Sequence, residues 1–228
     1  MKAVIFDKFG SAQEVVEIQN IEDPKINDNE VIVKLSKSGV NPSDVKKRAG
    51  AFSNLLDNGF VVPHSDGAGV IVDVGNEVSR DRIGERVWVY QAQYERNYGT
   101  AAELLSIDSS RAVKLPDNTS LETGACLGIP AMKAHRCIFA DGSVEGKNIL
   151  VTGGAGRVGD YAIQWGKLFG ATVITTASND DDKQACIDIG ADGVINHREE
   201  DWELSALDAN HGEKFDRLVD VEFGANLN

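Results

Sequence analysis

The first half of the chain alternates short apolar, β-branched segments with turn residues. These segments are KAVIF (2–6), EVIVKLS (30–36), GAGVIVDVG (67–75), ERVWVY (85–90) and RAVKLP (111–116). Short strands at this spacing predict a compact, mostly β domain, built as a barrel or a sandwich. Helical patterns are rare in this half. The strongest is NPSDVKKRAG (41–50), in which Asn41 or Ser43 would cap a short helix.

In the second half of the chain the apolar residues follow a different spacing. Residues 121–140 predict a helix or a helix pair with an interruption at Pro130. After that, strands alternate with helices: strands are expected in 147–153, 171–177, 192–197 and 215–222, and helices in 156–170, 180–191 and part of 199–212. This alternation predicts a parallel, doubly wound α/β sheet. We therefore expect a β-rich domain over residues 1–122 and a doubly wound α/β domain over residues 123–228.

The net charge excludes some classes of binding partner, and the number and spacing of the cysteines indicate a cellular compartment. The chain has 23 Lys and Arg against 36 Asp and Glu, a formal net charge of −13. That balance argues against a general nucleic-acid or anionic-membrane binder, because such partners are held by cations. Three cysteines without a CxxC motif predict reduced thiols in a cytoplasmic protein. No signal-peptide pattern and no apolar run long enough for a membrane span is seen.

The stretch ILVTGGAGRVGDYA (149–162) contains the clearest chemical motif. Gly153, Gly156 and Gly159 stand three residues apart, between a predicted strand and a predicted helix. Glycines allow a tight turn, a close approach of backbone to a pyrophosphate and close packing of the helix on the sheet, while the helix N-terminus attracts the phosphates. A tight βα turn without a ligand is the alternative, but the βαβ context favours a dinucleotide site that includes Arg157 and Val158.

The end of the second predicted strand indicates which dinucleotide is preferred. A carboxylate there would bind the ribose 2′-hydroxyl of NAD, whereas this strand runs out at Thr176, Ala177 and Ser178. Ser178 and Lys183 can contact a 2′-phosphate. The acidic residues 180–182 are interpreted as the solvent-facing first turn of the next helix. The sequence therefore predicts NADPH rather than NADH.

Several motifs, in order along nearly the whole chain, resemble one known family. They are SGVNPSDVKKRAG, PHSDGAGVIVDVG, IGERVWV, GTAAEL, LGIPAMKAHR, VTGGAGRVG and GADGVINHREEDW. Together they resemble the zinc-free quinone oxidoreductase branch of the medium-chain dehydrogenase/reductase family, the branch that includes zeta-crystallin. The resemblance implies a GroES-like barrel followed by a Rossmann domain. It also implies hydride transfer from NADPH to a quinone or to the double bond of an enone or enal, and a homodimer in the full-length form.

The resemblance also bears on metal binding. Zinc-dependent members of the family bind a catalytic zinc through a Cys and a His, and in this chain Asn41 and Ser65 take those two places. Neither is a usual zinc ligand. We therefore expect no metal, although His64, Asp66 and Asp44 are close enough in the motif to leave an adventitious ion open.

The resemblance makes Asn41 the first candidate catalytic residue, since an amide there could donate a hydrogen bond to the developing oxyanion of the acceptor. The alternative is that Asn41 only caps the following helix. Asp44 is a second candidate, with support of Arg48 or of the helix start as its alternative. Phe52 is a candidate apolar wall for a flat ring, and an ordinary core or surface aromatic is equally consistent with the sequence.

On the cofactor side the resemblance adds Pro130 and His197, the latter where the family carries a Tyr or His near the adenosine phosphate. A surface loop histidine is the alternative for His197. Arg157 and Lys133 depart from the family pattern. A cation at the start of a helix opposes its dipole, and a bound anion would offset this, so Arg157 either assists the phosphates or extends into solvent.

Two other functions stay open at this point. One is a non-catalytic nucleotide-binding protein, and the other is an enoyl-thioester reductase or another zinc-free dehydrogenase on the same fold. Only four strands of a six-stranded dinucleotide-binding sheet are found in the sequence. We therefore expect the chain to be truncated at its C-terminus relative to the family, and to be a poor catalyst by itself.

Overall fold

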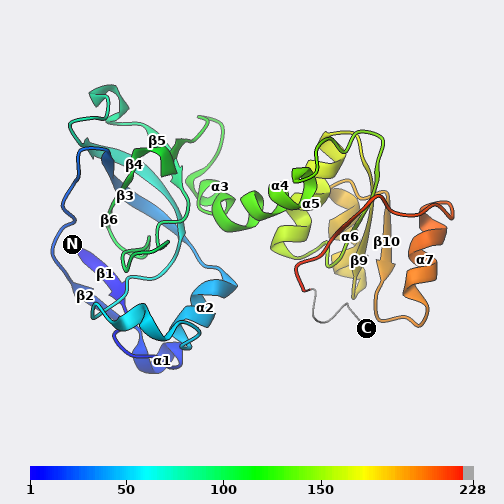
Figure 1. Cartoon of the computed structure of the whole chain (residues 1–228), viewed down its shortest axis with the longest axis horizontal. Coiled ribbons are helices and arrows are strands. Elements are labelled where there is room, and N and C mark those ends of the chain that lie inside the picture. Colours follow the sequence, from blue (N-terminus) through cyan, green and yellow to red (C-terminus); the bar gives the residue numbers. More distant parts are fainter. Residues whose placement is uncertain (223–228) are drawn as a thin grey trace. The chain divides into compact units, whose positions relative to one another are not determined.

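The computed structural model describes residues 1–222, and the chain divides into two compact units, Met1–Ile129 and the residues from Pro130 onward (Figure 1). The division lies shortly after the boundary expected between residues 122 and 123, and the last six residues of the expected second domain lie outside the described part. Each unit has its own buried apolar clusters. No helix of the described residues is long and apolar enough to cross a membrane.

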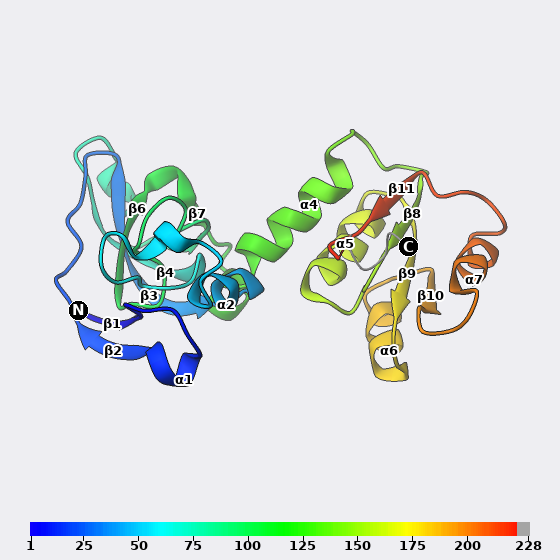
Figure 2. The same cartoon turned by 60° about the horizontal axis from the view of Figure 1, so that its bottom comes forward.

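Unit 1 is built on a five-stranded antiparallel sheet with the strand order β6-β3-β4-β5-β7. Its strands are β3 (Glu30–Gly39), β4 (Asp66–Val74), β5 (Arg86–Val89), β6 (Leu104–Asp108) and β7 (Ala112–Lys114). A separate antiparallel pair, β1 (Lys2–Ile5) with β2 (Glu17–Asn20), lies near the N-terminus (Figure 2). All five predicted strands of this half are present, and β2 and β6 are additional.

Alternation along the strands builds the core of unit 1. Val31 and Val33 of β3 are fully buried and pack with Ile71 of β4 and with Leu105 and Ile107 of β6. The short helices lie between strands: α1 (Ala12–Val15), α2 (Pro42–Arg48), α3 (Leu121–Gly124) and the 3-10 turns η1 (Ser53–Leu56), η2 (Arg80–Arg82) and η3 (Ser109–Arg111). The predicted helix over 41–50 corresponds to α2.

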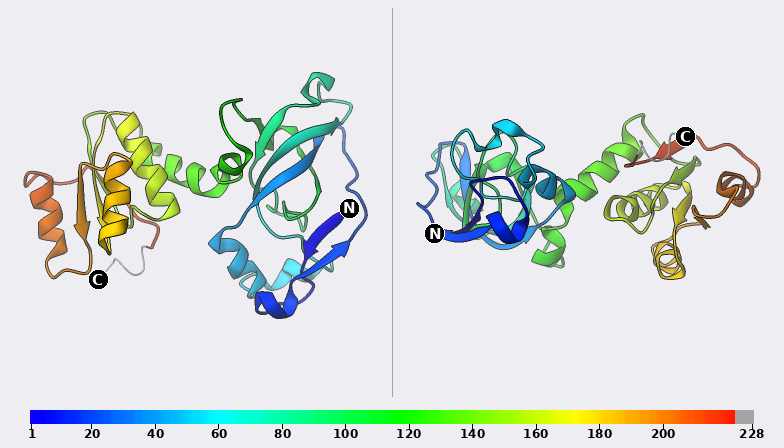
Figure 3. Two further views of the ribbon diagram at one scale, coloured as in Figure 1. Left: turned by 180° about the vertical axis from the view of Figure 1, so that it is seen from behind. Right: turned by 90° about the horizontal axis from the view of Figure 1, so that it is seen from below.

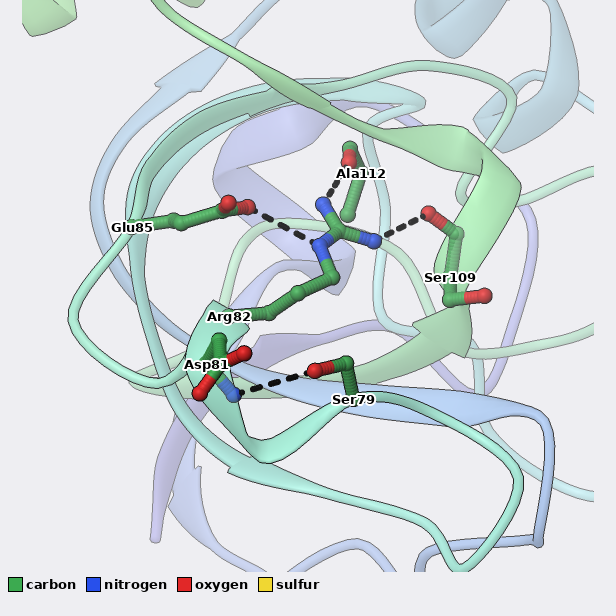
Figure 4. A network of polar contacts seen from close by, with 6 residues as sticks. All are labelled: Ser79, Asp81, Arg82, Glu85, Ser109 and Ala112. Carbon is green, nitrogen blue, oxygen red and sulfur yellow. Dashed lines mark hydrogen bonds and ion pairs between the residues drawn. The ribbon is translucent and has the colours of Figure 1, made fainter.

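One arginine holds two of these turns together (Figure 4). Arg82 donates from Nη1 to the carbonyl of Ser109 at 2.9 Å and from Nη2 to the carbonyl of Ala112, and its Nε pairs with Glu85 at 2.9 Å. The N-cap Ser79 accepts from the amide of Asp81 at the start of η2. These contacts tie η2 to the start of β7, so Arg82 has a structural role here.

Unit 2 contains a parallel sheet with the strand order β10-β9-β8-β11. The strands are β8 (Asn148–Val151), β9 (Thr172–Ala177), β10 (Gly193–Asn196) and β11 (Arg217–Val219), and β11 lies beside β8 (Figure 2). The helices between them are α5 (Arg157–Leu168), α6 (Asp180–Asp188) and α7 (Trp202–Ala209). In sequence order the strands follow the pattern 3-2-1-4, which confirms the predicted doubly wound α/β arrangement.

The two faces of this sheet are covered by different helices. Ile149, Val151 and Val173 face a cluster formed with α4 (Met132–Phe139), α5 and α6, whereas Leu150 and Ile174 face a second cluster that includes Ala206 of α7. Figure 3 shows the strands between α7 and α5. Because both faces are buried, the strands read as continuous apolar runs rather than alternating ones.

The helical segment before β8 differs from the sequence expectation at Pro130. The break falls at Ala125–Cys126, after α3, and the chain is then helical through the wide turn η4 (Leu127–Ala131) into α4. Proline has no N–H and its ring crowds the preceding turn. A π-type turn accommodates both constraints, which explains why Pro130 lies inside the helical run instead of ending it.

Close backbone contacts shape the turn from β8 into α5. A β-carbon on residue 159 would lie 2.3 Å from the carbonyl oxygen of Gly153 and 2.8 Å from Cα of Gly154. A β-carbon on residue 154 would lie 2.2 Å from Oγ1 of Thr175. Gly153 itself has a φ of +64°, which favours glycine. Three of the four loop glycines are therefore required by the fold of the turn.

We predict that Gly159→Ala lowers the free energy of unfolding by about 1–3 kcal/mol, because the added methyl group overlaps backbone that cannot easily move. Gly156→Ala is the matched control. Residue 156 has a φ of −72°, and its added β-carbon would lie 3.1 Å from the nearest atom, so we expect a loss below about 1 kcal/mol. Urea unfolding curves measure both, and equal losses in the two variants would contradict the packing argument.

Candidate functional site

The carboxyl ends of β8, β9 and β10 carry most of the predicted cofactor residues. The loop after β8 is tied to β9 by two hydrogen bonds: the amide of Gly153 donates to Oγ1 of Thr176, and the amide of Gly154 donates to its carbonyl, both at 2.9 Å. Ligands of open parallel sheets bind at this edge. The tie to Thr176 thus fixes the glycine loop at the place where a dinucleotide would be held.

The N-terminus of α5 is open at this edge. Gly156 is the N-cap, has no side chain to accept from the first-turn amides, and is exposed together with Gly153 and Arg157. Val158 is half-buried and packs against the core, and Gly159 is buried. Uncapped amides and the positive end of a helix dipole suit a phosphate. These residues therefore fit the pyrophosphate of a dinucleotide.

The next positions along the edge follow β9. Ser178 is half-buried directly after the strand, and Asn179 caps α6 by accepting from the amide of Asp182 at 2.9 Å. Lys183 lies one turn into α6. It lines a cavity of about 170 Å³ that Asp180 and Glu199 also line. The acidic first turn of α6 is as predicted, and Asp180, at its start, is exposed.

The remaining residues that were considered for cofactor binding lie in other parts of unit 2. His197 follows β10, is exposed, and donates its amide to the carbonyl of Ala177 at 3.2 Å, so it lies beside the end of β9. Pro130 lies in η4 and Lys133 in α4. Within residues 1–222, no hydrogen bond joins either of these two to the glycine loop. Their roles toward a cofactor stay predictions.

A second group of polar residues lies in unit 1, around the carboxylate of Asp66. Asp66 begins β4 and is 1% exposed. Its Oδ2 accepts from Nδ2 of Asn41 and from the amide of Ile129, both at 2.8 Å. The carboxylate thus joins three segments that are far apart in the sequence. The motif analysis noted Asp66 only as a neighbour, and no local pattern signals its central position.

The structure brings the two candidate residues Asn41 and Asp44 together at the start of α2. Asn41 is the N-cap of α2, and its amide donates to Oδ2 of Asp44 at 2.8 Å. Asp44 therefore supports the helix start, while Arg48 donates to the carbonyl of Gly10 instead. The structure thus shows Asn41 at the start of the helix, with its side-chain amide donating to Asp66, and its catalytic role stays a prediction. The second hydrogen of that amide is left for another acceptor.

Burial sets the protonation of this group. It raises the pKa of Asp66 to about 6, against the hydrogen bonds from Ile129 and Asn41, and the neighbouring charge of Asp44 adds to the increase. Burial also raises the pKa of Asp44 and lowers the pKa of Lys47, which donates to Oε1 of Gln93 at 3.0 Å. Perturbed groups of this kind are typical of functional sites.

Four buried polar atoms of this region have no hydrogen-bond partner among the described residues. They are Oγ of Ser43, Oδ1 of Asp44, Oδ1 of Asp66 and Nε2 of Gln93. A β-carbon on residue 128 would lie 2.1 Å from Oδ1 of Asp66, so glycine is needed beside it. Buried unsatisfied atoms are costly in free energy. Their concentration here marks the region as a candidate ligand or water site.

The donor set does not fit a catalytic zinc ion. Asn41 faces Asp66 with its Nδ2 group, which cannot coordinate a metal, and Ser65 is 5% exposed. In the part of the chain that the structure describes, no group of three His, Cys, Asp or Glu side chains could hold a metal ion. Phe52 is 53% exposed at the start of η1, so its role as an aromatic wall stays a prediction.

We predict that Asp66→Asn changes the pH dependence of stability. Asn keeps one oxygen to accept from Asn41 and Ile129, and it carries no charge. Because the folded pKa of Asp66 is raised from 3.8 to about 6, the stability it contributes is full below pH 3.8 and is lost as the pH rises through 6.

The free energy of unfolding of Asp66→Asn should therefore increase relative to that of the parent between pH 4 and pH 8, by an amount on the order of 3 kcal/mol. Urea unfolding at four pH values measures this difference. A difference that stays constant with pH would contradict the assignment.

Comparisons with known proteins agree with both halves of this description. The alcohol dehydrogenase GroES-like domain matches residues 27–117, and the zinc-binding dehydrogenase family matches residues 158–225. A mycobacterial protein solved in complex with NADPH is 27% identical, with a TM-score of 0.81 over 96% of this chain and 66% of that one. The fold of both units is thus that of the alcohol dehydrogenase superfamily.

Two curated relatives cover most of the sequence. Quinone oxidoreductase from Homo sapiens is 32% identical over 231 residues, 100% of this chain and 68% of the relative. The 2-methylene-furan-3-one reductase from Solanum lycopersicum is 30% identical over 208 residues, 89% of this chain and 54% of the relative. The chain therefore spans between about half and two thirds of the length of these relatives. It belongs to the medium-chain dehydrogenase/reductase family of oxidoreductases, in the quinone oxidoreductase branch.

Proposed function

We propose that the chain belongs to an NADPH-dependent oxidoreductase that transfers hydride to a quinone or to an activated carbon–carbon double bond. The observation that carries this proposal is the open, glycine-built N-terminus of α5 at the carboxyl edge of a parallel sheet. Its similarity to a human quinone oxidoreductase and to a tomato 2-methylene-furan-3-one reductase supports it. A homodimer and a cytoplasmic location remain predictions from the sequence.

In this proposal, residues of unit 2 bind the cofactor and residues of unit 1 contact the acceptor. The amides at Arg157 and Val158 would bind the pyrophosphate, and Ser178 with Lys183 would bind the 2′-phosphate. NADPH, when bound, supplies the hydride. The protein supplies position and electrostatics, which is the usual division for a cofactor enzyme. Arg157 then has an anion to offset its position at the positive end of α5.

In unit 1, Asn41 is the proposed contact for the acceptor. Its Nδ2 donates one hydrogen to Asp66 at 2.8 Å, which fixes the amide plane. The other hydrogen can donate to an acceptor oxygen on which negative charge develops. A preorganised donor in a buried site stabilises such charge more than water does. Asp44 and Asp66 would act as positioning residues, because they hold the start of α2 and the Asn41 side chain.

The preference for NADPH is tested with charge reversal at one lysine. We predict that Lys183→Glu weakens NADPH binding by about 1–3 kcal/mol, because a charge-assisted contact becomes repulsive. NADH binding should change little. Lys214→Glu is the matched control, since Lys214 is exposed and precedes β11, at the opposite edge of the sheet. Asp180→Asn should strengthen NADPH binding, because it removes a negative charge from a residue that lines the same cavity as Lys183.

Calorimetric titration of each variant with both cofactors measures these shifts. Tighter binding of NADH than of NADPH by the parent chain would refute the proposed preference.

The reaction is tested by NADPH oxidation with a small quinone and with a 2-alkenal, before and after chelator treatment and dialysis. We expect turnover with at least one acceptor and no loss after chelation, because Asn41 and Ser65 stand where zinc ligands would be needed. Activity lost on chelation and restored by zinc would refute the metal-independent mechanism. No NADPH oxidation with either acceptor would refute the proposed reaction.

A further inference from the structure

His64 has an unusual backbone conformation immediately before β4. Its φ is +77°, a region that residues other than glycine rarely adopt. The backbone is held there from one side: the carbonyl of His64 accepts from the amide of Thr100 at 2.9 Å, and a β-carbon on residue 99 would lie 2.2 Å from the same oxygen. Such strain persists where the surrounding structure enforces it, and it clusters at functional sites.

The imidazole of His64 lies at one end of a series of three hydrogen bonds. Nδ1 of His64 lies 2.8 Å from Oγ of Ser38, and Oγ of Ser38 lies 2.8 Å from Oγ1 of Thr100. Oγ1 of Thr100 in turn donates to the carbonyl oxygen of Asp66 at 2.6 Å. The three contacts need three hydrogens, and each hydroxyl has only one to give.

The backbone carbonyl of Asp66, at the end of this series of hydrogen bonds, determines which atom donates in each contact. A carbonyl oxygen only accepts, so Thr100 uses its hydrogen there. Ser38 must then donate to Thr100, and the only remaining hydrogen for the third contact is on Nδ1 of His64. The imidazole is therefore fixed in the Nδ1–H form, both when neutral and when protonated. Its other nitrogen, Nε2, carries the lone pair and is the atom that gains or loses a proton.

This series of hydrogen bonds orients the imidazole ring and does not conduct protons. The peptide carbonyl of Asp66 has no proton to supply, so none can pass through Thr100 and Ser38 to Nδ1. Proton exchange is thus confined to Nε2. No hydrogen bond to Nε2 occurs among residues 1–222, so this atom is left for solvent or a ligand.

The electrostatic setting links His64 to the polar group around Asp66. Burial lowers the pKa of His64, and the negative charge of Asp44 opposes this effect. Asp44 in turn interacts with Lys47 and Asp66. His64 therefore belongs to the same group of residues as Asn41, whose amide donates to Asp44 at 2.8 Å.

We propose that Nε2 of His64 delivers the proton that accompanies hydride transfer, an inference that rests on the proposed reductase function. The hydride brings two electrons and one hydrogen to the acceptor. The Nε2–H bond of the imidazolium breaks, and an O–H bond forms on the reduced quinone, or a C–H or O–H bond on the reduced enone. His64 is left neutral and regains its proton from solvent at Nε2.

The first test is the tautomer of His64 in the complete 228-residue chain labelled with ¹⁵N in its four histidines. Two-bond couplings between ring nitrogens and carbon-bound protons distinguish the two neutral forms. His64→Asn identifies the His64 signals and suits the site, because Asn tolerates a positive φ. We expect Nδ1–H in the parent chain and a shift toward Nε2–H in Ser38→Ala. An Nε2–H form in the parent, or no change in Ser38→Ala, would overturn the inference.

The second test is the pH profile of acceptor reduction with NADPH. We expect kcat of the parent to fall above the pKa of His64 measured by NMR, because a proton donor must be protonated. His64→Asn should lower kcat at least about tenfold and remove this pH dependence, with the dissociation constant of NADPH unchanged. If His64→Asn keeps the kcat and the pH dependence of the parent, the inference about His64 is overturned and the proposed function is not. Absence of turnover in the parent overturns the proposed function, and the inference with it.

Discussion

The absence of β-carbons at residues 154 and 159, in the turn from β8 into α5, is the constraint on which unit 2 depends. The carbonyl of Gly153 occupies the space that a β-carbon on residue 159 would need, and Thr175 occupies the space that one on residue 154 would need. This close approach places the uncapped start of α5 at the carboxyl edge of the sheet. The parallel strands then bring Ser178 and His197 to the same edge. The tight turn that the fold requires is also the shape that a pyrophosphate requires.

A buried carboxylate has the corresponding position in unit 1. Asp66 receives hydrogen bonds from Asn41 and Ile129, and its own carbonyl terminates the chain of hydroxyls that orients His64. One residue thus fixes both an amide donor and an imidazole ring. Burial of this carboxylate away from water raises the pKa of Asp66 and leaves its Oδ1 atom without a hydrogen-bond partner among residues 1–222.

Much of the fold is predictable from the sequence because periodicity reports burial. The four strands of unit 2 were found as apolar runs, since both faces of that sheet are covered. In unit 1, β2 was missed because all four of its residues are exposed and give no apolar face. The expected strand over 30–36 extends to Gly39 through an irregularity between Leu35 and Lys37. That polar extension carries Ser38, whose importance no local pattern signals.

The candidate site was predictable to a similar, limited extent. The glycine loop and Asn41 each belong to a local motif whose chemistry follows from residue type and spacing. The network of His64, Ser38 and Thr100 does not, because Ser38 is 26 residues from His64 and 62 from Thr100 along the chain. The donor directions in that network depend on a carbonyl that only the folded chain brings to Thr100. Contacts of this kind require the structure.

The central claim is that the glycine loop of unit 2 holds NADPH, and hydrogen–deuterium exchange with and without NADPH tests it most directly. Bound pyrophosphate would occupy the open amides at the start of α5. We predict slower exchange in residues 153–160 and 177–183, and no change in the β1–β2 pair, which serves as the internal control. Unchanged exchange in residues 153–160 at a saturating NADPH concentration would contradict the account.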